Sequence, residues 1–455
     1  MRIELDKPLT LSYIKGIFCI PYNAEDGNIV ISAITTDSRL VKKGDLFIAI
    51  DGENISGEDF VESAGSKGAY IISRKWEKAD IKVKDTRDAL LLIAEKYKEK
   101  FHLKETVVIT GSVGKTTTKN ITSALLSTKF KTHSTKGNLN NELGVPYTVL
   151  SMKEDTEILV IEAGMNHKGE LKRLSRCIKP TLAVITNIGT AHIGNLGSRE
   201  EIAKAKLEIL GDDLSCFALV PYGEELLDNI INKATVSCSS EFDEFFLKTV
   251  KYSGESLEFE YYSQELSIPK SEIASAGLHI KECLAFALAV CITSGMSEKD
   301  MIHAIKAISS IFHSKREQIG NLTVIDDSYN ASYESVKLAL ATLCMHKDRA
   351  VSLLIGDMLE LGSMAERLHF SVGMLAAKSN LKHLYAFGRY APDVKKGAVA
   401  YGMKSEDIFV NTDLDSPDKT ALEIFKRSEN ELILFKASNK VGLYRIKDIL
   451  KTFYQ

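Results

Sequence analysis

The fold is decided by the run Thr106-Val107-Val108-Ile109-Thr110, which leads directly into Gly111-Ser112-Val113-Gly114-Lys115-Thr116-Thr117. The first run is apolar and β-branched, as in a buried strand, and the pattern that follows through Leu126 is helical. Glycines let such a loop turn its N–H groups onto phosphate oxygens, and the helix N-terminus adds the positive end of its dipole. A glycine-rich turn that only caps a helix is the alternative, but the strand–loop–helix order favours a phosphate-binding loop.

Two side chains of this loop have chemical roles in such a site. Lys115 can reach the outer phosphates of a nucleotide, and the Thr116 hydroxyl can ligate Mg²⁺. The longer consensus of these loops has another glycine at position 109, where this chain has Ile109. We therefore interpret residues 111–117 as a shortened variant of the phosphate-binding loop.

Apolar runs alternate with helical patterns from about residue 30 onward, which is typical of α/β domains with mostly parallel sheets. We expect strands at residues 106–109, 158–161, 182–186, 322–325, 351–355, 384–387 and 432–435. Residues 281–293 are rich in alanine and predict a helix. Residues 237–269 are more polar, and we expect this region to be less regular.

The length of the chain and two of its segments predict the domains. A chain of 455 residues exceeds a single core and corresponds to roughly two to four domains. The charged run Glu95–Lys100 resembles a solvated helix end or a linker, and a second boundary falls near His313–Arg316. We predict three domains: residues 1–102, residues 103–313 and residues 314–455.

Composition excludes several classes of protein. The net charge of −3 gives no electrostatic reason to expect a nucleic acid or an anionic membrane as a partner. No apolar run approaches the roughly 20 residues of a membrane span, and the first residues lack the layout of a signal peptide. The seven cysteines are scattered without a Cys-x-x-Cys pair, as expected for reduced thiols in a cytosol. These features predict a cytoplasmic enzyme without stable membrane insertion.

Polar side chains follow two of the expected strands. Glu162 comes at the end of the run 158–161, and His192 follows the run 182–186 by a short loop. Because the carboxyl ends of parallel strands face the ligand crevice of an open α/β sheet, Glu162 can ligate Mg²⁺ there. A loop cap is the alternative for the glutamate, and a loop histidine without a role is the alternative for His192.

Lys206 occupies an unusual place on the next expected helix. Ile202, Ile209 and Leu210 form its apolar stripe, and Lys206 falls within that stripe. A lysine on a buried face must extend its amine to solvent, lose its charge or change chemically. The spacing leaves these alternatives open.

Several motifs together resemble those of the Mur ligase family, and the resemblance covers nearly the whole chain. They are Thr36–Arg39, Gly44–Phe47, Thr110–Thr117, Gly137–Pro146, Glu162–His167, Ala191–His192, Asp326–Ala331 and Gly356–Gly362. The resemblance is strongest to the member that adds a dipeptide. It implies a small N-terminal α/β domain for a uridine nucleotide, a central P-loop ATPase-like domain and a Rossmann-like C-terminal domain.

The resemblance also implies site residues. Lys115 and Arg316 would contact the γ-phosphate, and Asp327 and Asn330 would hold the nucleoside. Thr116 and Glu162 would bind one Mg²⁺, and His192 with Lys206 a second, because the family carbamylates the lysine that matches Lys206. The residues implied for the uridine nucleotide and the muramoyl peptide are Ser38, Arg39, Asn138, Asn140 and Asn141.

The implied reaction joins D-Ala-D-Ala to UDP-MurNAc-tripeptide through an acyl phosphate, with ATP and two Mg²⁺ ions. It would serve peptidoglycan synthesis, cell-wall biogenesis, cell shape and cell division, and we expect a monomer. The diamino acid of the tripeptide is not evident from the sequence. A ligase for another acceptor, such as D-Ala-D-Ser or D-Ala-D-lactate, and an ATPase or nucleotide-binding module that joins nothing are the two alternatives.

Departures from the family pattern underlie the first alternative. They are Ile280 in Gly277–Ile280, Ala437 and Asn439 in Lys436–Asn439, Tyr444 where the family has a glutamate, and Ser56-Gly57-Glu58 where it has Asp-Gly-His. An arginine is a fork-shaped donor suited to carboxylates, whereas Asn439 offers only neutral hydrogen bonds. We therefore expect an altered grip on the carboxylate end of the second substrate; the alternative is that these positions face solvent and the changes are neutral.

Overall fold

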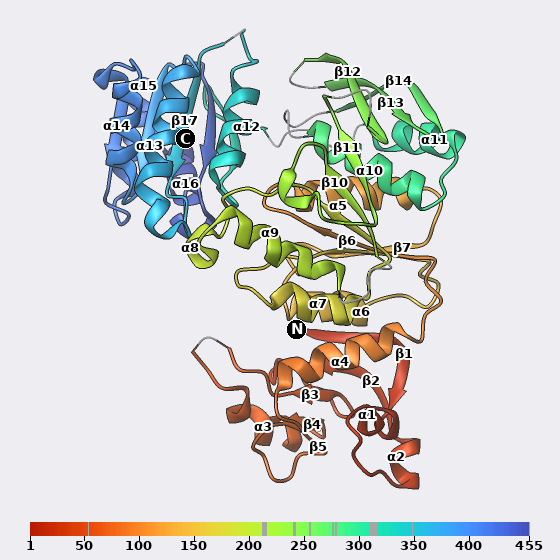
Figure 1. Ribbon diagram of the computed structural model, residues 1–455. Coiled ribbons are helices and arrows are strands. Elements are labelled where there is room, and N and C mark those ends of the chain that lie inside the picture. Colours follow the sequence, from red (N-terminus) through yellow and green to blue (C-terminus); the bar gives the residue numbers. More distant parts are fainter. Residues whose placement is uncertain are drawn as a thin grey trace. The chain divides into compact units, whose positions relative to one another are not determined.

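The computed structural model describes residues 1–52, 54–211, 216–239, 243–253, 256–274, 277, 280–309, 316–347 and 349–454 (Figure 1). The predicted α/β class is confirmed: strands of the described residues form mostly parallel sheets with helices packed on them. The chain divides into two compact units. The first comprises residues 1–110, 129–184 and 205–218, and the second residues 111–128, 185–204 and 219–455. The predicted domain bounds stay a prediction, and the bound at 313/314 lies outside the described residues.

An N-terminal sheet opens the first unit. Its strands, in spatial order, are β1 (Arg2–Thr10), β2 (Val30–Thr35), β3 (Leu46–Ile48), β4 (Tyr70–Ser73) and β5 (Ile81–Lys82). β1 and β2 are antiparallel, and the other neighbours are parallel. The helices are α1 (Leu11–Ile17), α2 (Ala24–Asn28), α3 (Val61–Ser66) and α4 (Thr86–Lys98). The charged run Glu95–Lys100 is thus a helix end, as predicted, and Tyr97 within it is buried.

Four further strands of the first unit lie side by side in the order β9-β6-β8-β7. Their bounds are β6 (Glu105–Thr110), β7 (Thr132–Ser134), β8 (Ile158–Glu162) and β9 (Leu182–Ile185). β6, β7 and β8 are parallel, and every residue of β8 is buried. The helices of this part of the first unit are α6 (Gly144–Leu150) and α7 (Glu170–Ile178). Helix α8 (Ile193–Leu196) and residues 199–204 of α9 (Arg199–Leu207) belong to the second unit. The strands predicted at 106–109, 158–161 and 182–186 are confirmed within one residue.

Strands of the second unit correct the expectation for residues 237–269. The order is β14-β13-β12-β11-β10, with β10 (Phe217–Pro221), β11 (Lys233–Ser237), β12 (Phe245–Tyr252), β13 (Ser256–Ser263) and β14 (Ser267–Ala274). The expected irregular region is instead largely antiparallel strand. Its polar composition reflects alternation, because Leu257, Phe259 and Tyr261 are buried while the residues between them are not. The helices are α5 (Lys115–Leu126), α10 (Ile280–Thr293) and α11 (Glu298–Ile308), and α10 confirms the predicted helix.

The C-terminal sheet has the order β15-β16-β20-β17-β18-β19, parallel except for β15 against β16. Its strands are β15 (Arg316–Ile319), β16 (Leu322–Asp327), β17 (Val351–Gly356), β18 (His383–Phe387), β19 (Ile408–Asn411) and β20 (Leu432–Lys436). Its helices are α12 (Tyr333–Leu343), α13 (Ala365–Lys378), α14 (Ala391–Ala400), α15 (Pro417–Arg427) and α16 (Tyr444–Phe453). The four strands predicted here are confirmed. Short 3₁₀ turns are η1 (Gly57–Phe60), η2 (Glu208–Leu210), η3 (Glu225–Leu227), η4 (Gly362–Met364), η5 (Ser405–Asp407) and η6 (Asn439–Val441).

Helices α13 and α14 lie side by side in Figure 1, and they touch backbone to backbone. A Cβ atom added to Gly373 would lie 1.9 Å from the Val394 carbonyl oxygen, and one added to Gly397 would lie 2.0 Å from the Phe370 carbonyl oxygen. Only glycine fits at these two positions, since real Cβ contacts are never so short. No helix among the described residues is both long and apolar enough to cross a membrane.

Candidate active site

The phosphate loop has the predicted strand–loop–helix form. β6 ends at Thr110, and α5 begins at Lys115 after Gly114, whose φ of 89° is left-handed. Gly111 has a φ of 142°, and a Cβ atom there would lie 1.9 Å from the Thr186 hydroxyl oxygen. Both the backbone conformation and the close approach therefore require glycine at position 111.

A neighbouring loop fixes the backbone of the phosphate loop. Asn187 Oδ1 accepts from the backbone N–H groups of Ser112 (3.1 Å) and Val113 (2.9 Å), and Asn187 Nδ2 donates to the Val113 carbonyl at 2.9 Å. The Thr186 hydroxyl donates to the same carbonyl at 2.6 Å. The Gly189 N–H donates to the Ser112 hydroxyl at 2.9 Å. The sequence did not predict this role of Asn187, although its place just beyond β9 was the available signal.

Lys115 lies over its own loop. Its ammonium group donates to the carbonyl oxygens of Gly111 (2.8 Å) and Ser112 (3.2 Å). Thr116 is exposed and Thr117 is half-buried. To contact a phosphate, the Lys115 amine has to turn away from these carbonyls, which a flexible four-carbon stem allows.

Glu162 is a buried carboxylate with an available oxygen. It is the last residue of β8, it is 1% exposed, and it pairs in register with Ile109 on the strand that leads into the phosphate loop. Asn140 Nδ2 donates to its Oε1 at 2.7 Å, and its backbone N–H donates to the Thr135 hydroxyl at 3.0 Å. Its Oε2 is buried without a hydrogen-bond partner. Because a buried anionic oxygen needs a partner, Glu162 fits the expected role of a cation ligand.

His192 is held by a carboxylate. It has a left-handed φ of 64° at the start of α8, and its Nδ1 lies 2.6 Å from Glu360 Oε2. Because an ionised carboxylate only accepts, Nδ1 carries a proton, and in the neutral ring Nε2 keeps the lone pair. This arrangement fits a metal-ligating histidine, which usually donates its other N–H to a carboxylate or carbonyl.

Lys206 is buried, as the sequence predicted. It is 2% exposed on α9, beside Ile202 and Ile209, which are both fully buried. The stripe does not continue as one α-helix, because α9 ends at Leu207 and Leu210 is half-buried on η2. No group of three or more His, Cys, Asp or Glu side chains suitable for a metal ion occurs in the described part of the chain. The predicted metal ligands instead include a threonine and a modified lysine.

Asp327 and Asn330, expected to hold the nucleoside, are brought together by Lys436. The Lys436 ammonium group is buried and lies 2.8 Å from Asp327 Oδ2, and it donates to the Asn330 carbonyl at 2.6 Å. Arg316 is the first residue of β15, pairs in register with Ile325 on β16, and is half-buried. Lys436, the first residue of the motif Lys436–Asn439, thus shapes the loop after β16, a role that the sequence did not predict.

Among the residues expected to bind the muramoyl substrate, two have internal partners. Asn140 holds Glu162, and Asn141 Oδ1 accepts from the Gly144 N–H at 2.9 Å at the start of α6. Asn138 is exposed. A contact with substrate would therefore be an additional role for Asn140 and Asn141.

The two residues expected near the uridine nucleotide lie in the first unit. Ser38 is buried, while Arg39 is exposed and forms a bidentate ion pair with Asp37 at 2.8 and 2.9 Å. The hydrogen bonds from Arg39 lower the pKa of Asp37 to about 2. The exposed guanidinium group is available to a ligand only if it leaves this partner or shares it.

Sequence and structure comparisons decide the family. Three family descriptions match: "Mur ligase family, catalytic domain" at residues 30–98, "Mur ligase middle domain" at 109–291 and "Mur ligase, glutamate ligase domain" at 312–439. The chain is 33% identical to UDP-N-acetylmuramoyl-tripeptide--D-alanyl-D-alanine ligase of Bacillus subtilis, with 96% of this chain and 97% of the relative covered. The chain belongs to the Mur ligase family. The prediction of a ligase is therefore confirmed.

Solved structures agree with this membership. Crystal structure I of MurF from Acinetobacter baumannii has a TM-score of 0.85 at 26% identity, covering 99% of this chain and 100% of that one. The MurF ligase of Thermotoga maritima in complex with ADP has a TM-score of 0.80 at 27% identity, covering 92% and 97%. The Mur ligase fold therefore extends over nearly the whole chain.

The departures from the Mur ligase pattern have different structural contexts. Ile280 is buried at the start of α10, and Leu278 and His279 lie outside the described residues. Ala437 is buried against Gly356, whereas Asn439 and Tyr444 are exposed. The Bacillus subtilis relative is named for D-alanyl-D-alanine, and nothing in its name supports the alternative acceptor.

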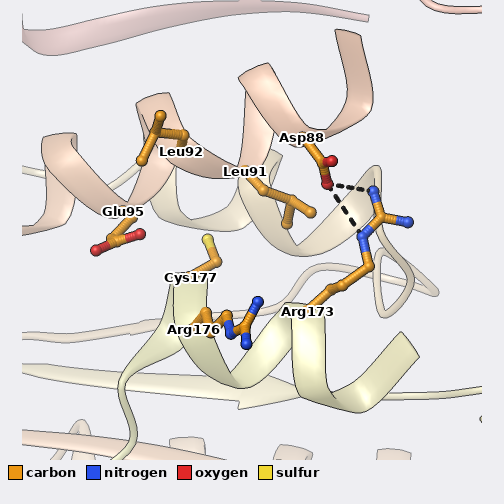
Figure 2. Close-up of a pocket in the computed structure, with 7 residues that line it drawn as sticks. All are labelled: Asp88, Leu91, Leu92, Glu95, Arg173, Arg176 and Cys177. Carbon is orange, nitrogen blue, oxygen red and sulfur yellow. Dashed lines mark hydrogen bonds and ion pairs between the residues drawn. The ribbon is translucent and has the colours of Figure 1, made fainter. Parts of the chain in front are cut away.

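A pocket elsewhere in the first unit lies between α4 and α7 (Figure 2). Its charged groups neutralise one another: Arg173 is 2.6 Å from Asp88 and 2.8 Å from Glu142. Burial raises the pKa of the Cys177 thiol to about 12, so this cysteine stays protonated and unreactive. The pocket is lined by none of the predicted site residues.

Proposed function

We propose that this chain joins D-Ala-D-Ala to the terminal carboxylate of UDP-MurNAc-tripeptide, with ATP as the energy source. The product is the UDP-MurNAc-pentapeptide precursor of peptidoglycan, made in the cytoplasm by a monomeric enzyme. The unpartnered, buried Oε2 of Glu162, at a strand end in register with Ile109, is the observation that carries the ATP-dependent chemistry. The Bacillus subtilis relative, which is matched over 97% of its length, is named for this reaction and supplies the substrates.

The reaction begins with two anions that repel each other. The tripeptide carboxylate attacks the γ-phosphorus of ATP, and ADP leaves. Lys115 and Arg316 would neutralise the charge that develops on the phosphoryl oxygens. The amine of D-Ala-D-Ala then attacks the acyl carbon of the acyl phosphate, inorganic phosphate leaves, and a peptide bond remains. Residues 111–117, Asp327 and Asn330 would hold ATP in the first step and ADP afterwards.

The implied Mg²⁺ ions would add further neutralising charge at the phosphates. Thr116 and Glu162 would hold one, and His192 through Nε2 with carbamylated Lys206 the other. Carbamylation turns a buried cation into an anionic oxygen ligand, which suits the buried position of Lys206.

Carbamylation of Lys206 has a direct test. Intact-mass and peptide analysis in bicarbonate should find one carbamate on Lys206 and none on Lys204, the exposed lysine of the same helix. Lys206→Ala should be nearly inactive and should regain part of its activity with short carboxylic acids, whereas Lys204→Ala should remain active. An unmodified Lys206 in a fully active preparation would rule the carbamate out.

The reaction itself is tested by product analysis. Purified protein should form UDP-MurNAc-pentapeptide and phosphate only when ATP, UDP-MurNAc-tripeptide and D-Ala-D-Ala are all present. Parallel assays with D-Ala-D-Ser, D-Ala-D-lactate and with lysine or meso-diaminopimelate tripeptides define both substrates. Phosphate release that needs neither peptide would identify an ATPase instead and refute the proposal.

A further inference from the structure

The loop that fixes the phosphate loop is itself held from a distant part of the sequence. Glu334 Oε1 accepts from the Thr190 backbone N–H at 2.8 Å, and Glu334 Oε2 accepts from the Thr190 hydroxyl at 3.1 Å. The two residues are 144 positions apart in sequence and lie in the same compact unit. Among the described residues, both donors to this carboxylate come from Thr190. One carboxylate thus fixes both the backbone and the side chain of a single loop residue.

The carboxylate has a rigid support. Glu334 is the second residue of α12, whose N-cap Ser332 forms a capping box with Ser335. A Cβ atom added to Gly189 would lie 2.9 Å from Glu334 Cδ, so the carboxylate rests directly on the loop backbone. The helix start and the loop are therefore packed without room for another side chain between them.

A second carboxylate holds the far end of the same loop. Glu360 accepts from His192 at 2.6 Å, and its carbonyl accepts from the Gly194 N–H at 3.0 Å. The loop is thus anchored by Glu334 at Thr190 and by Glu360 at His192 and Gly194. Arg199 also donates to the Ile188 carbonyl of this loop at 2.9 Å, while the contacts of Asn187 and Gly189 go to Ser112 and Val113.

We propose that Glu334 is a positioning residue for the phosphate loop. It acts through Thr190. The carboxylate fixes Thr190, and this in turn fixes the backbone of residues 187–190. Asn187 then holds the peptide groups of Ser112 and Val113 in place. The conformation of the phosphate loop then depends on a side chain that does not touch the nucleotide. The inference rests on the proposed function only in taking ATP as the ligand of residues 111–117.

Amide hydrogen exchange tests the relay without any substrate. In Glu334→Ala we expect faster exchange at the amides of Ser112 and Val113, which lose their fixed acceptor on Asn187. Glu366→Ala is the matched control, because Glu366 is also the second residue of its helix and is exposed. It should leave these amides unchanged. Faster exchange throughout the second unit, including β17, would make Glu334 a general structural residue and overturn the proposal.

Nucleotide affinity is the second readout. The KM for ATP and the Kd for Mg²⁺·ADP should rise about 10-fold in Glu334→Ala, the factor that one charge-assisted hydrogen bond supports. The KM for D-Ala-D-Ala should stay within about twofold, since the change is confined to the phosphate loop. Unchanged exchange at Ser112 and Val113 together with an unchanged Kd for Mg²⁺·ADP would refute the relay. Failure of ligation alone would count against the proposed substrates instead.

A double-variant cycle checks the pathway through Thr190. Thr190→Val removes the hydroxyl donor but keeps the backbone N–H, so its effect on the Kd should be smaller than that of Glu334→Ala. The double variant should equal Glu334→Ala alone, because the hydroxyl acts only through that carboxylate. Additive effects would show that Glu334 and Thr190 act separately and would contradict the relay.

Discussion

Two glutamates of this protein are equally buried and differ in what surrounds them. Glu162 and Glu431 are each 1% exposed. Glu162 ends β8, has one side-chain donor in Asn140, and keeps a buried oxygen with neither a hydrogen bond nor an ion pair among the described residues. Glu431 lies directly before β20, where Ser352 donates to its Oε2 at 2.5 Å and the Lys382 ammonium group forms an ion pair of 2.7 Å with its other oxygen, Oε1. His383 is a further cationic partner when protonated.

The comparison separates burial from function. Burial opposes the charge of Glu431, but hydrogen bonds from His383, Lys382 and Ser352 hold its pKa at about 2. At Glu431, before the amino end of β20, the fold itself supplies the positive counter-charge. At Glu162, the carboxyl end of β8, a bound cation would supply it. In open α/β sheets the carboxyl end is also where ligands bind. The availability of an oxygen, rather than its burial, therefore marks the candidate functional carboxylate.

The largest effect should come from Glu162→Gln. Glutamine keeps the shape and the bond from Asn140 but removes the charge, so turnover should fall by roughly 10²–10³. The midpoint of thermal unfolding should not fall, since an underpartnered buried charge is lost. Phosphate release and calorimetry measure the two quantities, with the exposed Glu154→Gln as control. Near wild-type turnover at every Mg²⁺ concentration would show that Glu162 is not a functional carboxylate.

The opposite pattern is expected for Glu431→Gln. Its unfolding free energy should drop by about 1–3 kcal/mol, because Lys382 and His383 lose a charged acceptor. Turnover should stay within about twofold of the wild type. Urea unfolding followed by a C-terminal-domain probe gives the free energy. A fully stable variant would mean that the ion pairs around Glu431 contribute nothing.

The pH dependence of the unfolding free energy tests the stabilising role of Glu431. A carboxyl group whose folded pKa is depressed stabilises the fold above its unfolded value of about 4.3, and this stability is lost as pH falls toward about 2. The stability difference between wild type and Glu431→Gln should thus be constant from about pH 7 to pH 5 and shrink below about pH 4.5. Urea midpoints at several pH values between 7 and 3 measure it. A difference that grows on acidification would reverse the sign and contradict the assignment.

The smallest expected effect is a pH-dependent change in stability that comes from a buried histidine, His369. His369 is 1% exposed, its Nε2 accepts from the Met358 N–H at 2.9 Å, and its Nδ1 donates to the Ala365 carbonyl at 2.7 Å. Burial lowers its pKa below the ordinary value of about 6.5, so protonation costs stability as pH falls below that value. Relative to His369→Gln, the wild type should lose stability between about pH 7.5 and pH 5.5. A parallel pH response of the two proteins would show that His369 is not buried in its neutral form.

The sequence predicted what local patterns encode. Strand β8 and its terminal Glu162, the phosphate loop and the buried Lys206 all follow from apolar runs, glycine spacing and helical period. The hydrogen-bond partners could not be predicted from the sequence, because Asn140 reaches Glu162 and Glu334 reaches Thr190 only once distant segments have packed. The antiparallel strands β12 to β14 were not predicted, because apolar and polar residues alternate along them and the segment is polar on average. Roles for the predicted ligands came from the family resemblance rather than from spacing.

The contact between α13 and α14 has a consequence at the level of the gene. Every single-base change in the first two positions of a glycine codon encodes a residue with a Cβ atom or a stop. At Gly373 and Gly397 such an atom would meet a carbonyl oxygen at about 2 Å. A saturation library of this gene should therefore recover only synonymous third-base changes at these two codons, while the codon for the exposed Gly402 accepts replacements that tolerate its φ of 96°.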